Sequence, residues 1–168
     1  MSIQQILHYP DPRLRKIAAR VDVFDNSLHT LVEDMFETMY DASGIGLAAT
    51  QIDIHRRVIV VDITCDKSSP LHLINPIIKE KFGLVESKEG CLSVPQMIDY
   101  VDRAERVVVA AVRSDGSAFA VETEGLLAIC IQHEIDHLDG KLFIDYLSSL
   151  KQSRLRKKLH KENGQQVY

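Results

Sequence analysis

The stretch His133-Glu134-Ile135-Asp136-His137 contains the residues best suited to chemistry in this sequence. On an α-helix, His133 and His137 project from the same face about one turn apart, a spacing that suits two nitrogen ligands of one metal ion. Glu134 then stands beside the first ligand and can reach a water on the metal as a general base. The pattern predicts a catalytic divalent metal; the alternative is a helix that merely contains two histidines.

The residues around this stretch favour the metal. The run 125–138 is mostly apolar and contains no proline and no internal glycine, which predicts a helix buried on most sides. Ionisable side chains on such a helix are costly unless something pairs with them. A bound cation would supply that partner.

A catalytic site of this type needs a third protein ligand and an open fourth position. Downstream, the longer zinc-protease pattern would place a histidine where the chain has Phe143, and the only later glutamate is Glu162 in a polar tail. A cysteine upstream is the better candidate. Cys130 lies on the helix that carries the histidines and would form nearly a line with them, whereas Cys91 arrives from a separate element 42 residues before His133. We favour Cys91 as the ligand and expect Cys130 to be a small buried side chain near the site.

The size and composition of the chain are those of one ordinary globular domain spanning positions 1–168. Of its 168 residues, 45% are hydrophobic and 26% are charged. Residues 1–12 show no export signal, and no apolar run approaches membrane-spanning length. The three widely spaced cysteines argue against a disulfide framework, and Cys65 is then a bystander thiol. We expect a cytoplasmic protein.

Helices are expected in the first part of the chain. Residues 27–40 carry apolar side chains at intervals of three and four, with Asn26 or Ser27 as the cap and Gly44 after the end. Residues 13–19 follow two prolines and form a short helix. The first of these helices is amphipathic and therefore packs on a core.

Short apolar segments without helices between them predict antiparallel or mixed sheets. The expected strands are 57–62, 71–75 and 77–82, with a break at Pro76, and the hairpin 107–113 with 118–123. The predicted fold class is α+β, with small sheets packed around the central metal-binding helix, an amphipathic helix before them and a helix at the C-terminal end.

The segment 44–51 (GIGLAATQ) has two glycines followed by small residues, so its backbone can come close to another group. It is neither a phosphate loop nor a dinucleotide fingerprint, because no Gly-Lys-Ser/Thr and no third glycine follows. Tight packing and a functional role are equally open for it. Gln51 could donate a hydrogen bond into a site.

The C-terminal segment is strongly basic. Residues 151–161 contain six lysines and arginines and no acid; subtracting these six charges from the total of −4 leaves −10 for the rest of the chain. Leu155 and Leu159 lie four apart, which indicates a helix over about 149–162. Such a helix is most often a solvated surface helix, and the alternative is a helix that docks on a polyanion such as RNA or a membrane surface.

Three stretches together, 44–51 (GIGLAATQ), 89–93 (EGCLS) and 133–137 (HEIDH), resemble the signature motifs of the peptide deformylase family, in order and at suitable spacing. The resemblance covers nearly the whole chain and is closest to the Gram-negative bacterial type with a helical C-terminus. It implies a metal-dependent hydrolase that removes the formyl group from the formyl-methionine of nascent polypeptides and releases formate. It also implies one divalent metal ion, Fe(II) first, with Zn(II), Ni(II) or Co(II) able to replace it.

The resemblance also implies a role for individual residues. The metal ligands would be Cys91, His133 and His137. The catalytic groups would be Glu134 as general base and later acid, with Gln51 and the backbone N–H of Leu92 holding the developing oxyanion. The substrate-binding residues would be Gly46 and Gly90, which would receive the peptide as an extended strand, and Ile45, Leu126, Ile129 and Cys130, which would line the methionine pocket.

Departures from the family pattern concern the substrate. Some relatives carry an arginine just after the cysteine motif, where this chain has residues 96–98 (QMI) and no arginine before Arg103; Ser87 stands where an apolar residue is common. The resemblance implies nascent peptides and the ribosome near its exit tunnel as partners, the latter through the basic helix, and neither a membrane nor DNA. The rival functions are a metallopeptidase of broader specificity and a module with a structural metal.

Overall fold

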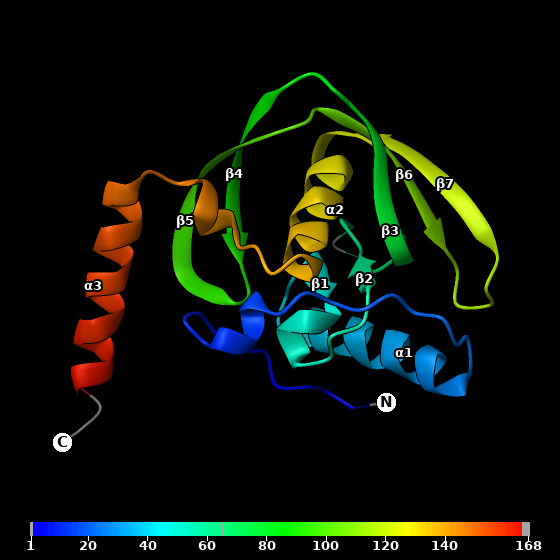
Figure 1. The fold of residues 1–168 in the computed structure, drawn as a ribbon, viewed down its shortest axis with the longest axis horizontal. Helices are drawn as coiled ribbons and strands as arrows, with labels where there is room; N and C mark the ends of the chain where they lie inside the picture. The colour runs from blue at the N-terminus through cyan, green and yellow to red at the C-terminus, as the bar shows by residue number, and fades with distance from the viewer. Residues whose placement is uncertain (1, 65, 166–168) are drawn as a thin grey trace.

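The computed structural model describes residues 2–64 and 66–165 (Figure 1); Cys65 lies outside them. The α-helices are α1 (Asn26–Asp41), α2 (Gly125–Leu138) and α3 (Ser149–Gln165), and the 3-10 helices are η1 (Pro12–Arg15), η2 (Ala49–Ile52) and η3 (Phe143–Tyr146). The strands are β1 (Gly46–Ala48), β2 (Val58–Val61), β3 (Leu71–Phe82), β4 (Val85–Cys91), β5 (Val94–Arg103), β6 (Arg106–Val112) and β7 (Ala118–Glu124). The predicted α+β class is confirmed.

The larger sheet is antiparallel and has the strand order β1-β2-β3-β6-β7. Its two faces bury different helices, which is visible along β2. Ile59 and Val61 join the cluster that contains the apolar side chains of α2, whereas Val58 and Val60 join the cluster that contains those of α1. Because both faces are covered, β2 is a continuous apolar run rather than an alternating one.

The second sheet is the hairpin of β4 and β5, which lies on the other side of α2 from strands β3, β6 and β7 (Figure 1). Val94 and Val101 of β5 anchor the hairpin in a third apolar cluster with Leu142, Phe143 and Leu147. Helix α2 is therefore enclosed between two sheets, which explains why it is apolar on nearly every side. Strands β1, β4 and β5 are not among those predicted from the sequence.

Helix α1 begins one residue earlier than expected, and its cap is Asp25, whose side chain accepts from Leu28 N–H at 3.2 Å, rather than Asn26 or Ser27. At its end the left-handed residue is Ser43, with φ 55°, and Gly44 N–H bonds Met39 O at 2.9 Å. The chain therefore leaves α1 with a serine, not a glycine, in the left-handed conformation.

Two further predictions were wrong in part. The short helix expected at 13–19 is the 3-10 helix η1, which ends at Arg15. Pro76 does not break the strand: β3 runs through it with a register shift between Ile74 and Ile77, and Asn75 takes φ 51°. A β-bulge leaves one residue without a hydrogen bond to the neighbouring strand. Proline fits such a position because it has no N–H to donate.

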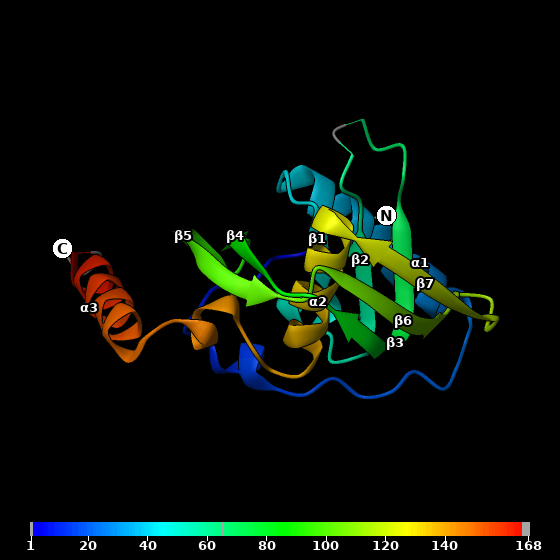
Figure 2. The same ribbon diagram turned by 90° about the horizontal axis from the view of Figure 1, so that it is seen from above.

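Helix α3 lies at one end of the molecule, beyond η3 (Figure 2). Leu155 is buried in the third apolar cluster with Leu159 packed against it, and Lys151 bonds Asp99 of β5 at 2.8 Å. The basic helix expected at 149–162 is thus present and fixed to the hairpin by one apolar side. None of the helices in the described ranges combines the length and the apolar content needed to span a membrane.

Candidate metal centre

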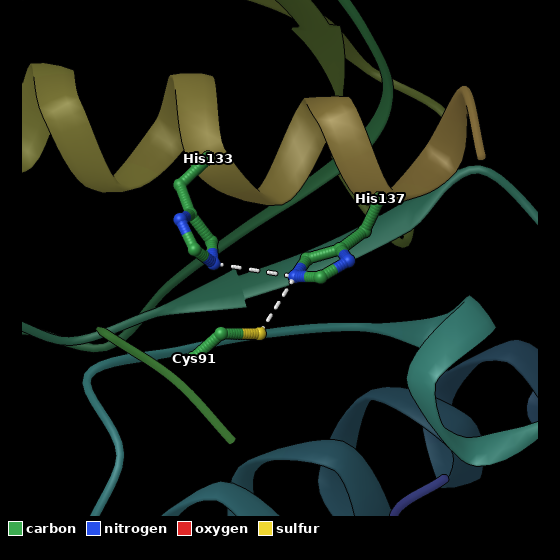
Figure 3. A group of neighbouring side chains, drawn as sticks. All are labelled: Cys91, His133 and His137. Carbon is green, nitrogen blue, oxygen red and sulfur yellow. Dashed lines mark hydrogen bonds between the residues drawn. The ribbon is translucent and has the colours of Figure 1, made fainter. Parts of the chain in front are cut away.

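Three potential metal ligands converge at the centre of the molecule, two from α2 and one from the end of β4 (Figure 3). His137 Nε2 lies 3.2 Å from His133 Nε2 and 3.3 Å from Cys91 Sγ, and the three ligand atoms all lie within 4.8 Å of one another. Metal–nitrogen bonds of about 2.0–2.1 Å and metal–sulfur bonds of about 2.3 Å would place tetrahedral ligands at such separations. The donors therefore fit one divalent ion, and the structure brings Cys91 together with His133 and His137 as the sequence predicts.

The rival thiol lies elsewhere. Cys130 is buried and its Sγ donates to Ile45 O at 3.6 Å, away from the ligand cluster. Burial, together with the nearby Glu134, raises the pKa of the Cys130 thiol well above its ordinary value. It remains a neutral thiol that fills space beside the centre.

A carboxylate orients the first histidine. His133 Nδ1–H donates to Glu89 Oε2 at 2.9 Å, which fixes the tautomer that turns Nε2 toward the other ligands. Arg103 donates two hydrogen bonds to Glu89, at 2.7 and 2.9 Å, and one to Asp136, at 2.6 Å. Burial disfavours the charge on Glu89, but the bonds from Arg103 and His133 outweigh it and lower the pKa of Glu89. Tyr146 completes the chain by donating to Asp136 at 2.8 Å.

Sequence reasoning missed the roles of Glu89 and Arg103. A signal existed for the first, because Glu89 precedes the ligand Cys91 by two residues and on a strand would share its face. No local pattern marks Arg103, which comes from the far end of β5. Burial lowers the pKa of His137 well below its ordinary value, which keeps this imidazole neutral as a ligand must be.

Glu134 is the unpaired acid of the centre. Its side chain is buried, and in the described part of the chain its Oε2 has no hydrogen-bond partner. Burial raises the pKa of Glu134 to about 7, and a cation held by the neighbouring ligands would favour its charged form. A Cβ built on Gly46 would stand 2.4 Å from Glu134 Oε1, so only glycine leaves room for the carboxylate. The close approach of segment 44–51 to another group is thereby explained.

The Gln51 amide is held in one orientation. Its Oε1 accepts from Ala48 N–H at 2.8 Å, which turns Nε2 toward Ser93 Oγ at 3.1 Å and Cys91 Sγ at 3.8 Å. Ser93 N–H in turn donates to Cys91 Sγ at 3.4 Å. Two N–H groups therefore support the sulfur, and both hydrogens of the Gln51 amide, which lines the adjoining cavity, have acceptors in this structure.

A cavity of about 430 Å³ opens onto Cys91 and His133. Its walls come from the chain after α1, from the β4–β5 hairpin and from the first half of α2. Every residue predicted to bind substrate or an oxyanion lines it: Ile45, Gly46, Gly90, Leu126, Ile129, Cys130, Gln51 and Leu92. The residues that depart from the family pattern, Ser87 and residues 96–98, line it as well.

Backbone edges flank this cavity. Within the described strands, β4 pairs only with β5 and β1 only with β2, so each keeps one unpaired edge. Gly46 of β1 and Gly90 of β4 both line the cavity. An extended peptide could hydrogen-bond to such edges as an additional strand.

Comparison with known proteins agrees with this geometry. Residues 3–153 match the family model described as polypeptide deformylase. The sequence is 53% identical to the peptide deformylase of Pseudomonas aeruginosa over 168 residues, which cover 99% of this chain and all of that protein. It is 55% identical to the peptide deformylase of Pseudoalteromonas translucida over 162 residues, which cover 96% of this chain and 97% of that protein.

Solved structures are similar over the same extent. The crystal structure of a peptide deformylase from Legionella pneumophila has a TM-score of 0.92 and 52% identity, and the match covers 99% of this chain and 98% of that one. That of the Ehrlichia chaffeensis peptide deformylase in complex with actinonin has a TM-score of 0.91 and 39% identity, with 96% of this chain and 98% of that one covered.

Proposed function

Because this chain belongs to the peptide deformylase family, and is therefore a hydrolase with a Cys/His/His metal site, we propose that it removes the formyl group of N-formylmethionyl nascent peptides through Glu134, Gln51 and Leu92. The observation that carries the proposal is the position of the unpaired, buried Glu134 carboxylate beside three converging ligand residues, of which Cys91 and His133 line the same cavity as Glu134. A structural metal site is normally closed by four protein ligands. Three ligands and a carboxylate without a partner suit catalysis instead.

The ligands proposed to hold the metal are Cys91, His133 and His137. A thiolate with two imidazoles suits Fe(II) as well as Zn(II), Ni(II) or Co(II), and the family resemblance favours Fe(II). When bound, the metal supplies Lewis-acid polarisation and a water that ionises near neutral pH. Glu89 keeps His133 in the tautomer that ligation requires.

The protein groups then carry the proton and the developing charge. Glu134 takes the proton of the attacking water and passes it to the methionine nitrogen as the formyl C–N bond breaks, so the products are formate and a free amino terminus. Gln51 Nε2 and the backbone N–H of Leu92 donate to the former carbonyl oxygen. Each such donor is typically worth about 2.7–4 kcal/mol when removed. The bond from Gln51 Oε1 to Ala48 N–H holds the amide plane, so that Nε2 can exchange one of its acceptors, Ser93 Oγ or Cys91 Sγ, for this oxygen without an amide flip.

The substrate is proposed to lie extended between Gly46 and Gly90, with its methionine side chain toward α2. Leu126, Ile129 and Cys130 supply an apolar wall there. Methionine is unbranched and polarisable, which suits an apolar pocket that contains a thiol. The peptide backbone would use the unpaired edges of β1 and β4.

The basic face of α3 is proposed to dock on the ribosome near the exit tunnel. Arg154, Arg156, Lys157, Lys158 and Lys161 are exposed and make no ion pair within the described residues, whereas Leu155 is buried and fixes the helix. Five exposed cations on one helix suit the phosphate groups of RNA. Nascent chains on ribosomes would place the protein in the cytoplasm.

The decisive experiment measures formate release from a formyl-methionyl peptide by protein loaded with Fe(II) without oxygen. We expect rapid release, and Glu134→Gln should keep the metal while losing about 10²- to 10⁴-fold in turnover. The unblocked peptide serves as control, because its hydrolysis would indicate a broader metallopeptidase. No release by folded, metal-replete protein would refute the proposal.

Ribosome docking needs its own test. Truncation after Leu150 should abolish sedimentation with ribosomes but also removes the buried Leu155. A triple variant, Arg154→Gln, Lys157→Gln and Lys158→Gln, therefore tests the charges on an intact helix. Cosedimentation of the triple variant equal to that of the parent would exclude docking through this face.

A further inference from the structure

Lys88 is an exposed charge at the cavity that the chemistry described so far does not use. Apart from the two cysteines, the other charged or titratable side chains that line the cavity are Glu89, His133 and Glu134, which are buried and belong to the metal centre. Lys88 is exposed, and within the described ranges it makes no ion pair or side-chain hydrogen bond. A lysine left unpaired at the mouth of a cavity can meet a charge on whatever enters.

The alternation of β4 places Lys88 on a definite side of the cavity. Glu89 is buried and turns toward His133 on α2, so the Lys88 side chain projects from the opposite face of the strand. Across the hairpin, Lys88 lies opposite the half-exposed Tyr100, and Gly90 lies opposite the exposed Ile98. This outer face is therefore open over Gly90, which has no side chain, and carries its positive charge at Lys88.

Nearby acids do not cancel this charge at the cavity. Glu86, two residues before Lys88 in the chain, lies on the same outer face and opposite Asp102 on β5. Neither acid lines the cavity, and both lie on the side of Lys88 that is farther from the ligand Cys91. A peptide leaving the metal centre along β4 would meet Lys88 before it met either acid.

An extended peptide presents successive side chains to opposite faces. If its methionine points to the α2 wall, as proposed above, the side chain of the second residue points to the outer face of β4. We propose that Lys88 is a specificity-determining residue, which favours formyl-methionyl peptides with an acidic side chain at the second position. This inference rests on the proposed function and on the extended binding mode.

The test compares three amidated peptides, formyl-Met-Glu-Ser-NH₂ and its Gln and Lys counterparts, with the Fe(II)-loaded protein. Amidation removes the terminal carboxylate, which could otherwise bind Lys88 itself. We expect kcat/KM for the Glu peptide to exceed that for the isosteric Gln peptide by about two- to fivefold, mainly through KM, because exposed charge pairs are weak. The preference should vanish at 1 M salt, where screening acts within about 3 Å.

Variants separate the effect of the Lys88 charge from the effect of the overall charge of the protein. Lys88→Ala should abolish the Glu-over-Gln ratio, and Lys88→Glu should reverse the order toward the Lys peptide. Lys79→Glu is the matched control, because Lys79 is exposed on β3 and does not line the cavity. The Gln peptide serves as the reference for each protein, so that the Glu-over-Gln ratio corrects for any general change in activity.

The outcomes distinguish this inference from the function on which it rests. A Glu-over-Gln ratio that is the same in parent and Lys88→Ala, or a loss of the ratio in Lys79→Glu, overturns the role of Lys88 while formate release from the Gln peptide upholds the deformylase reaction. No formate from any peptide would refute both.

Discussion

Replacing Gly46 with alanine tests how tightly the catalytic carboxylate is confined. The new Cβ would stand 2.4 Å from Glu134 Oε1 and 2.8 Å from Cys130 Sγ, whereas ordinary contacts begin at 3.4 Å. Relief requires the Glu134 carboxylate to retreat by about 1 Å, and a displacement of about 1 Å at a reacting group can cost 10²-fold in rate. Overpacking should also lower the free energy of unfolding by about 1–3 kcal/mol.

The assay measures kcat/KM for a formyl-methionyl peptide together with bound metal and the urea midpoint of unfolding. We expect Gly46→Ala to keep its metal and fold and to lose about 10²-fold in kcat/KM. Gly44→Ala is the control, because among the described residues the one contact of its Cβ shorter than 3.4 Å would be with Leu92 Cδ1, at 2.7 Å, the movable end of a flexible side chain. It should lose less than tenfold, or about 1.4 kcal/mol.

The steric argument fails under either of two results. One is a Gly46→Ala protein whose kcat/KM stays within tenfold of the parent. The other is a loss of activity that follows the loss of bound metal, because the new methyl group would then act on the ligands rather than on Glu134.

Three further predictions concern the ligands and their support. Cys91→Ala should lose metal affinity and Cys130→Ala should retain it, as measured by metal competition at equilibrium; the reverse pattern would exchange the two assignments. Glu89→Gln should weaken metal binding by about 10- to 100-fold, because His133 loses its charged acceptor, and unchanged affinity would contradict that role. Arg103→Met should lower the free energy of unfolding by about 3–5 kcal/mol in urea, since it leaves Glu89 without its buried cation; a loss below 1 kcal/mol would show that the ion pair matters little.

The elements that could be predicted from the sequence are those whose buried apolar residues recur at the spacing of a helix or a strand. Helices α1 and α2 and the β6–β7 hairpin have apolar spacings or turn residues that leave little choice of structure. The ligands could be predicted for a geometric reason, because His133 and His137 share one helix face and cannot be joined by Cys130 from the same helix in a tetrahedral site.

The β4–β5 hairpin shows what the local pattern cannot supply. The sequence of β4, VESKEGC, has few apolar residues, because its inward face holds Glu89 rather than an aliphatic side chain. Glu89 is accommodated only by Arg103 and His133, which come from β5 and α2. A strand whose buried residue is charged looks like a loop in sequence, since the partners that neutralise it lie elsewhere in the chain.

The position of Cys91 at the end of this hairpin has a mechanical consequence. Its thiolate comes from β4 and the two histidines come from α2, so one bound ion would cross-link segments 42 residues apart in the chain. Removing the ion should leave α2 in place within its apolar clusters, while the hairpin loses its link through Cys91 and keeps its apolar contacts beside η3 and the polar bonds of Glu89, Arg103 and Ser93. The wall of the cavity would then be the first part of the molecule to exchange its amide hydrogens. A metal that serves the reaction would thus also fasten one wall of the cavity to α2.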